Sequence, residues 1–460
     1  MKRNVKQIAR RIATFGLAAI MLAGCGNSAA SGSNGGAESG DGATELTFMD
    51  VCPSAAREEY FTSVFESFEK ETGIHVSYES VPWDNAVDKL TVMGTSDELP
   101  DVMTLFSSWM GQFTSAGWAI PIDDYIAETR YEYNEYVQNV IFATEEEKFG
   151  ALYTVPDGIN TKGVYVRKDW AEEAGIDLSQ YEDGWTYEEY WSLIEALTDP
   201  EQNHYGMAFR GGRNGIDPFL FYYETFNKGY AYSEDGVSIL LNDDAAEKFE
   251  KFCSPYLKGY APADSINWSY SEMVDNFVGG LCGTFWNDSE VAAILLEEMD
   301  ESQWTVLPVP RSDVDGKMYN YANASYAYGI SDDCENPDAA WQLIEYLSNP
   351  ENNMQYCLMN GFVPVKSDVG DDPNYGEGGV YNIFVKELDD PDTVCPCSWG
   401  AFDYTDLSQG TFHEEMQKYL LGEKTAQQVM TELGEEVTER MQTYLKDNEG
   451  STIETPKSVN

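Results

Sequence analysis

Residues 44–105 read TELTFMDVCPSAAREEYFTSVFESFEKETGIHVSYESVPWDNAVDKLTVMGTSDELPDVMTL. Three short runs in this stretch have the apolar pattern of strands: residues 46–48, 75–81 and 102–105. Two runs between them have the features of helices: Tyr60 to Phe68, and a run that Asp84 can cap and Gly94 can close. Strands that alternate with helices in this way predict a parallel sheet covered by helices, and therefore an α/β fold.

A second module of the same kind is expected further along the chain. Residues 164–166 predict a short strand, and residues 169–174 predict the helix that follows it. Two residue pairs have the spacing of a capping box and predict helix starts: Thr186 with Glu189, and Thr425 with Gln428. Because strand and helix follow each other as in residues 44–105, we expect this module also to contain parallel strands.

The composition of the chain excludes two classes of protein. Of its 460 residues, 42% are hydrophobic and 13% aromatic, so the chain can bury the cores of two or three domains and is not a disordered protein. It carries 28 Lys and Arg against 80 Asp and Glu, a formal net charge of −52. Such a surface repels phosphate, so we expect no nucleic-acid partner.

The first residues have the pattern of a bacterial lipoprotein signal. A basic segment and then an apolar segment too short to span a bilayer occupy residues 2–22. The segment ends in Leu22-Ala23-Gly24-Cys25, which matches the lipobox, in which Cys25 receives the lipid. We therefore predict a signal peptide over residues 1–24, a flexible tether over residues 25–43, and a protein anchored on the outer face of the bacterial cytoplasmic membrane. An ordinary signal peptide with a chance cysteine is the alternative.

The sequence carries no motif of a catalytic or metal site. Its three histidines are His75, His204 and His413, and none lies in a zinc-binding helix motif. No Gly-x-Ser-x-Gly nucleophile elbow occurs. We therefore expect no enzyme, no metal and no cofactor. A glycoside hydrolase stays open as a weaker alternative, because its two carboxylates are not recognisable among 80 acidic residues.

The cysteines give an incomplete prediction. Seven remain after Cys25, an odd number, so at least one thiol should be free. Cys395 and Cys397 are the one closely spaced pair, but they lack the second pair and the nearby histidine of a typical metal site. Their role is left open.

Several segments along nearly the whole chain resemble one family of proteins. They are the Leu99-Pro100-Asp101-Val102 strand, the segments 152–156, 165–170 and 173–175, the helix 185–197, the segment 273–286 with Gly279-Gly280, Pro308 with Pro310, and the segment 420–426. In this order, behind a lipobox, they resemble the family 1 extracellular solute-binding proteins. Members of that family are sugar-capturing lipoproteins of ATP-binding-cassette (ABC) importers and are related to maltose-binding protein.

The resemblance implies an α/β, two-lobed periplasmic-binding-protein-like fold with three crossovers between the lobes. Lobe 1 would comprise residues 44–158 and 327–385, and lobe 2 residues 159–326 and 386–460. Two consecutive domains are the alternative architecture. The implied partners are a sugar or oligosaccharide ligand, the membrane permease subunits of an ABC importer, and the membrane itself through the lipid. The protein would act as a monomer.

A receptor for a neutral sugar needs flat aromatic faces and planar polar groups. By position in the family pattern, or as scarce cations, eight residues are expected to contact the ligand: Trp109, Asp157, Asn160, Arg210, Trp286, Asn287, Trp399 and Tyr404. Each has a structural alternative. The aromatic residues can serve simple packing, Asp157 and Asn160 can form a turn, and Arg210 can form a surface ion pair.

Two features leave the identity of the ligand open. Cys52 follows the first strand, where many family members have a tryptophan or a polar residue, which leaves the ligand contacts of this loop undefined. The acidic surface helps capture of a cation, hinders capture of a polyanion and is indifferent to a neutral sugar. A peptide, a polyamine or a metal chelate is therefore the alternative to a sugar.

Overall fold

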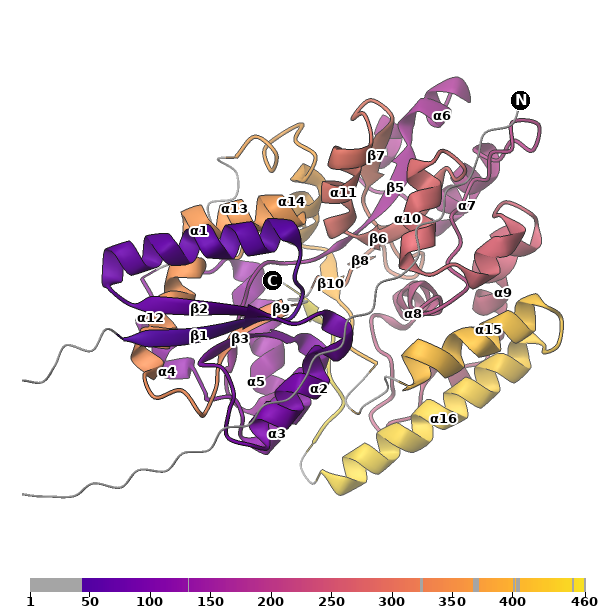
Figure 1. The fold of residues 1–460 in the computed structure, drawn as a ribbon. Helices are drawn as coiled ribbons and strands as arrows, with labels where there is room; N and C mark the ends of the chain where they lie inside the picture. Colours follow the sequence, from indigo (N-terminus) through magenta and orange to yellow (C-terminus); the bar gives the residue numbers. More distant parts are fainter. Residues whose placement is uncertain are drawn as a thin grey trace, which may run out of the picture. The chain divides into compact units, whose positions relative to one another are not determined.

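The computed structural model describes residues 44–130, 132–322, 326–366, 372–399, 402, 406–448 and 451–458. These residues belong to one compact unit, Ala43–Asn460 (Figure 1). The predicted signal peptide, the tether, the lipid-bearing Cys25 and the site residue Tyr404 lie outside the described residues.

A five-stranded sheet contains the predicted N-terminal module. Its strand order is β2-β1-β3-β9-β4, and β2, β1 and β3 are parallel, which confirms the predicted arrangement. The strands are β1 (Glu45–Asp50), β2 (His75–Ser80), β3 (Val102–Phe106), β4 (Thr154–Pro156) and β9 (Tyr326–Ile330). The associated helices are α1 (Ala55–Thr72), α2 (Trp83–Gly94), α3 (Met110–Ala116), α4 (Asp123–Glu128), α5 (Ala143–Phe149), α12 (Pro337–Leu347), α13 (Pro350–Asn360) and α14 (Asn382–Asp389).

Helix α1 shows how local sequence fixes this module. The Ser54 hydroxyl caps its first turn by accepting a bond from the Arg57 amide, and Gly73 ends it with a φ of 76°, a conformation that favours glycine. The buried side chains of the helix, among them Phe61 and Phe65, pack on Phe48 of β1. Figure 1 shows α1 along β1 and β2.

The second sheet has the order β6-β5-β7 and is antiparallel. Its strands are β5 (Lys162–Arg167), β6 (Thr284–Asp288) and β7 (Trp304–Leu307). The prediction of parallel strands in this module was wrong. The partners of β5 come from more than 100 residues further along the chain, after a long helical segment, and return in the opposite direction. That segment and its continuation hold α6 (Lys168–Glu173), α7 (Tyr187–Ala196), α8 (Asp217–Glu224), α9 (Ala245–Leu257), α10 (Tyr270–Val278) and α11 (Glu290–Glu298).

A third, small sheet contains short strands from three separate places in the chain. Its order is β11-β10-β8, with β11 antiparallel and β8 parallel to β10. The strands are β8 (Met318–Tyr319), β10 (Thr393–Cys395) and β11 (Lys457–Ser458). Because β8 follows the antiparallel sheet and precedes β9, it lies on a connection between the two larger sheets.

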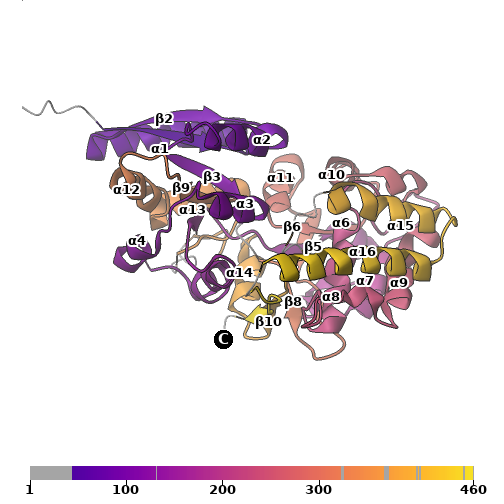
Figure 2. The ribbon, with the colours of Figure 1, turned by 90° about the horizontal axis from the view of Figure 1, so that it is seen from below.

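Both predicted capping boxes are confirmed, at the start of α7 and at the start of the C-terminal helix α16 (Ala426–Asp447). In each box the hydroxyl of the cap residue accepts a bond from the backbone of the third helical residue, whose side chain bonds back. The C-terminal helices α15 (Phe412–Leu420) and α16 (Ala426–Asp447) lie side by side, as Figure 2 shows in yellow, and α16 packs on α9.

The cysteines that follow residue 25 are all free thiols in the described structure. Within the described ranges, no helix combines the length and the apolar composition that a membrane span requires.

Candidate ligand-binding site

Two sheet edges meet at a short connection. Strand β4 ends at Pro156 and β5 begins at Lys162, so only residues 157–161 separate the two larger sheets here. Strand pairing brings the end of β3 and the start of β9 to the same edge as Pro156. Pairing of Lys162 with Asp288 brings the end of β6 to the edge at which β5 begins. In open α/β sheets, ligands bind outside the carboxyl ends of strands, so this junction is the candidate site.

The edge of the antiparallel sheet carries paired charges. The Lys162 Nζ lies 2.6 Å from the Asp288 Oδ1. Arg210 lies nearby, and burial lowers the pKa of its guanidinium against the opposing effect of Asp217 and Asp288. The pKa of Glu290 is raised to about 7, because burial and the charge of Asp288 outweigh the lowering effect of Lys162. These groups offer both donors and acceptors to a polar ligand.

Half-buried aromatic rings lie next to these charges. The centroids of the Phe221 and Tyr321 rings are 4.5 Å apart, and the Lys162 Nζ lies 4.7 Å from the centroid of the Phe221 ring. Phe221 comes from α8, and Tyr321 comes from the connection that leads to β9. The exposed part of a half-buried ring can contact the apolar face of a ligand.

The edge of the five-stranded sheet is built around a buried ion pair. The Arg57 guanidinium donates to both carboxylate oxygens of Asp50, at 3.1 Å from Nε and 2.7 Å from Nη2. It lies 5.8 Å from the centroid of the Tyr326 ring, which is half-buried. Cys52 lies beside Tyr326, and burial raises the pKa of its thiol, against a hydrogen bond with Tyr326 and the charge of Arg57. Cys52, whose role the sequence left undefined, is therefore part of this edge.

Asp157 and Asn160 hold the connection itself. The Tyr356 hydroxyl donates to the Asp157 Oδ2, and burial raises the pKa of the Asp157 carboxyl to about 7 in spite of Arg57 and Tyr356. Its Oδ1 has no hydrogen-bond partner in the described part of the chain. The Asn160 Oδ1 accepts bonds from the backbone and the hydroxyl of Ser289, at 3.2 and 3.0 Å. Both side chains are buried, so in this conformation they tie the two sheets together.

Three predicted tryptophans occupy packed positions. Trp109 is 8% exposed and its ring centroid lies 5.8 Å from that of Phe106. Trp286 is 9% exposed and packs on Phe221 in the core of the antiparallel sheet. Trp399 is 4% exposed and lies against Tyr232. Trp286 therefore lies behind Phe221, and the Phe221 ring separates it from the charged groups of the candidate site.

The structure brings part of the predicted set together. Arg210, Asn287 and Trp286 belong to the antiparallel edge or to the layer behind it, and Asp157 and Asn160 belong to the connection. The Asn287 Oδ1 accepts a bond from the Asp288 amide at 2.7 Å. The sequence singled out Cys52 without giving it a role, and it missed the following residues: Lys162, Phe221, Asp288, Glu290, Tyr321 and Tyr326. Lys162 and Asp288 lie at strand ends, where ligand contacts are expected, so the sequence could have indicated them. Their pairing depends on the register of β5 and β6, which the sequence does not show.

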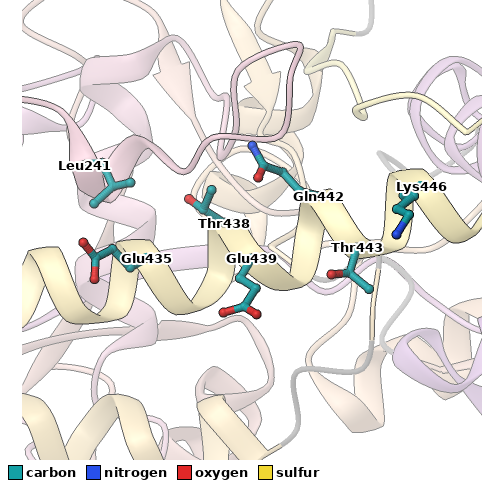
Figure 3. Close-up of a pocket in the computed structure, with 7 residues that line it drawn as sticks. All are labelled: Leu241, Glu435, Thr438, Glu439, Gln442, Thr443 and Lys446. Carbon is teal, nitrogen blue, oxygen red and sulfur yellow. The ribbon is translucent and has the colours of Figure 1, made fainter.

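The surface carries a hollow of about 420 Å³ elsewhere, along α16 (Figure 3). The residues that line it are Leu241, Glu435, Thr438, Glu439, Gln442, Thr443 and Lys446. None of these seven is aromatic, and the hollow is open along the helix, so it lacks the features of a sugar site. Among the described residues, no group of three or more His, Cys, Asp and Glu could hold a metal ion.

A family model and several sequences match this chain. The model described as bacterial extracellular solute-binding protein matches residues 54–354. A putative binding protein of Brucella abortus is 23% identical over 325 residues, which cover 68% of this chain and 74% of the relative. A maltooligosaccharide ABC transporter solute-binding lipoprotein of Streptococcus pneumoniae is 22% identical over 402 residues, covering 82% and 84%.

Solved structures also match. The sugar-binding protein MalE of Xanthomonas citri superposes with a TM-score of 0.71 at 20% identity, covering 88% of this chain and 100% of that one. The GacH receptor of Streptomyces glaucescens does so with a TM-score of 0.69 at 19% identity, covering 88% and 100%. These similarities confirm the predicted fold class, the two-lobed α/β fold of periplasmic binding proteins.

Proposed function

Because this chain belongs to the bacterial extracellular solute-binding protein family, we propose that it captures a sugar, most simply an oligosaccharide, for import by an ABC transporter. The observation that carries the proposal is the junction of the two sheet edges, where the half-buried aromatic pair Phe221 and Tyr321 adjoins the Lys162–Asp288 ion pair. Rings match the apolar faces of a sugar, and adjacent charged groups match its hydroxyls. The protein binds without a chemical step.

The proposed mechanism uses the two lobes. We assign lobe 1 to residues 44–158 and 327–385 and lobe 2 to residues 159–326 and 386–460, with residues 157–161 as the first of three crossovers. A sugar that touches both sheet edges favours the closed arrangement, because only that arrangement makes both sets of contacts. The closed form then docks on the permease subunits of the importer. Trp109, Trp399 and Tyr404 stay as predicted contacts of the closed form.

The proposed location is the outer face of the cytoplasmic membrane. The lipobox at residues 22–25 supports a lipid on Cys25 as the anchor, with the acidic body acting as a monomer at some distance from anionic lipids.

A cationic solute such as a polyamine is the second candidate. Among the described residues, the candidate site holds the acids Asp50, Asp157, Asp217, Asp288 and Glu290 and the cations Arg57, Lys162 and Arg210. The raised pKa values of Asp157 and Glu290 leave these two only partly charged at neutral pH, so the site itself is close to balanced. The chain as a whole has a formal net charge of −52, which attracts a cation and repels an anionic ligand, so we expect neutral sugars to bind and uronates to be rejected.

A thermal-shift screen tests the proposed function. The compact unit from residue 43 onwards is heated with maltotriose, other oligosaccharides, galacturonic acid, short peptides and spermidine. A solute that binds only the folded state stabilises it by about 2.7 kcal/mol at 100 times its Kd. We expect a rise in Tm with one series of neutral oligosaccharides. A rise with spermidine or peptides alone would contradict the sugar proposal in favour of another solute.

Replacing Phe221 by alanine should weaken binding of that sugar at least about tenfold, because it removes the face on which we propose the sugar stacks. Calorimetry measures the Kd of the wild type and the variant. Leu421 is 65% exposed at the end of α15, and none of the contacts described for the site involves it, so Leu421→Ala is the control and should leave the Kd unchanged. Equal affinities for wild type and Phe221→Ala would remove Phe221 from the site.

A further inference from the structure

The described end of the chain forms a segment that we call the C-terminal strap, residues 451–458. Its strand β11 pairs antiparallel with β10, with Cys395 opposite Lys457. Strand β10 pairs in turn with β8, on the connection that leads from the antiparallel sheet to β9. Figure 1 shows this yellow segment returning from the end of α16 towards β10. The strap therefore adds a strand to the small sheet that accompanies the connections between the larger sheets.

One side of the strap is attached to helix α5. Lys457 forms an ion pair with Glu147, and the Lys148 Nζ lies 3.0 Å from the Glu454 Oε2. Both partners in α5 are at most about one third exposed. Helix α5 is itself fixed to β4, because the buried Glu145 carboxylate accepts bonds from the hydroxyl of a β4 residue. These contacts join the strap to the five-stranded sheet.

The other side of the strap contacts segments that pack with the antiparallel sheet. The Cys397 Sγ donates to the backbone carbonyl of Glu454 at 3.0 Å, and the Ser398 Oγ donates to the Glu454 carboxylate at 2.7 Å. The Cys397 amide donates to the Gly229 carbonyl at 2.8 Å, and a Cβ at Gly229 would lie 3.2 Å from the Pro456 ring. Gly229 follows α8, which shares a hydrophobic core with β5.

We propose that the C-terminal strap is a conformational restraint across the two lobes and thereby sets the affinity for the solute. A rotation about residues 157–161 displaces Glu147 and Lys148 relative to Cys397 and Ser398, so it must stretch or break the contacts of the strap. The strap therefore stabilises the arrangement of this structure over others. The effect on affinity rests on the proposed function, whereas the restraint itself is measurable without a solute.

Hydrogen–deuterium exchange and small-angle X-ray scattering of the solute-free protein test the restraint. The Ile159 amide, which bonds to the Val363 carbonyl at 2.8 Å, reports on the connection. Truncation after Asn448 and the variant Lys457→Glu should each raise its exchange rate at least about threefold. Lys457→Glu combined with Glu147→Lys re-forms the ion pair with reversed charges and should return the rate to that of the wild type. If the truncated chain does not fold, the charge-reversal series decides.

The control breaks an ion pair that lies away from the strap. Lys251 of α9 pairs with Glu188 of α7 at 3.0 Å, so Lys251→Gln should leave the exchange rate and the scattering curve unchanged. With the sugar that the screen identifies, the Kd of the truncated chain should change at least about threefold, and that of the control should not. If no sugar binds, the proposed function is wrong, but hydrogen–deuterium exchange of the solute-free protein still tests the strap proposal. The strap proposal would be overturned if the Lys457→Glu variant had the same Ile159 exchange rate and the same scattering curve as the wild type.

Discussion

Replacing Arg57 by methionine should lower the free energy of unfolding by about 3–5 kcal/mol, because it leaves buried carboxyls without their cation. Arg57 is 3% exposed and Asp50 is fully buried, and the guanidinium holds both oxygens of that carboxylate. It also donates to the Tyr356 hydroxyl, which in turn donates to Asp157 in the crossover. Methionine has a similar length but supplies none of these bonds. Urea unfolding, followed by circular dichroism, measures the change.

An exposed ion pair provides the matched control for this substitution. The Lys70 Nζ lies 3.6 Å from the Glu66 Oε2, and the two side chains are 74% and 66% exposed. Because water replaces the lost partner at such a position, Lys70→Met should cost about 1 kcal/mol or less. Arg57→Lys keeps the charge but loses the two-pronged geometry, so its loss of stability should lie between those of Arg57→Met and Lys70→Met. Similar losses for Arg57→Met and Lys70→Met would show that the Arg57 network does not stabilise the lobe.

The network also explains why the first sheet could be predicted from sequence while its edge could not. The strands and helices of residues 44–105 follow one another directly, so local periodicity was sufficient to predict them. The predicted caps of the second helix were wrong, because α2 begins at Trp83 after Pro82 and its C-cap is Thr95 rather than Gly94. The Arg57 network joins α1, β1, α13 and the crossover, and Tyr356 lies almost 300 residues from Arg57. No local pattern identifies such a partner. The prediction that β5 runs parallel to its neighbours was wrong for the same reason, because its pairing with β6 and β7 is set by tertiary packing.

The candidate site was predictable to a similar extent. The family pattern predicted ligand contacts in the segment around Trp286, and the structure places the end of β6 at the junction of the two larger sheets. Along a strand, successive side chains point to opposite faces, so Phe285 joins one hydrophobic cluster and Trp286 another. The sequence does not say which face meets a ligand. Lys162, Phe221 and Tyr321 come together only through register and helix packing, which a single sequence does not reveal.

Raising the pH from 5 to 8 should destabilise the protein, because several buried carboxyls titrate in that interval, among them Glu145, Asp157 and Glu290. Burial raises the pKa of Glu145 and of Asp157 to about 7. In the unfolded chain these groups have pKa values of about 4. Between the two values the folded state holds more protons than the unfolded state, so the free energy of unfolding falls as the pH rises. Each group accounts for a loss of about 3–4 kcal/mol once the pH exceeds its folded pKa.

Urea midpoints at pH 5, 6, 7 and 8 measure how the stability changes with pH, and variants show which residues cause the change. Asp157→Asn and Glu145→Gln remove the titrating charge but keep an amide of similar shape, so each should flatten the decline between pH 5 and 8. Asp406 is the control, because its hydrogen bond with Arg440 lowers its pKa below the usual range. Asp406 therefore stabilises the protein above the unfolded pKa and loses that effect only in more acidic solution, so Asp406→Asn should leave the slope unchanged. A midpoint that stays constant or rises from pH 5 to 8 would mean that both buried carboxyls are already ionised in the folded state, paired with Arg57 or solvated by water that reaches the crossover.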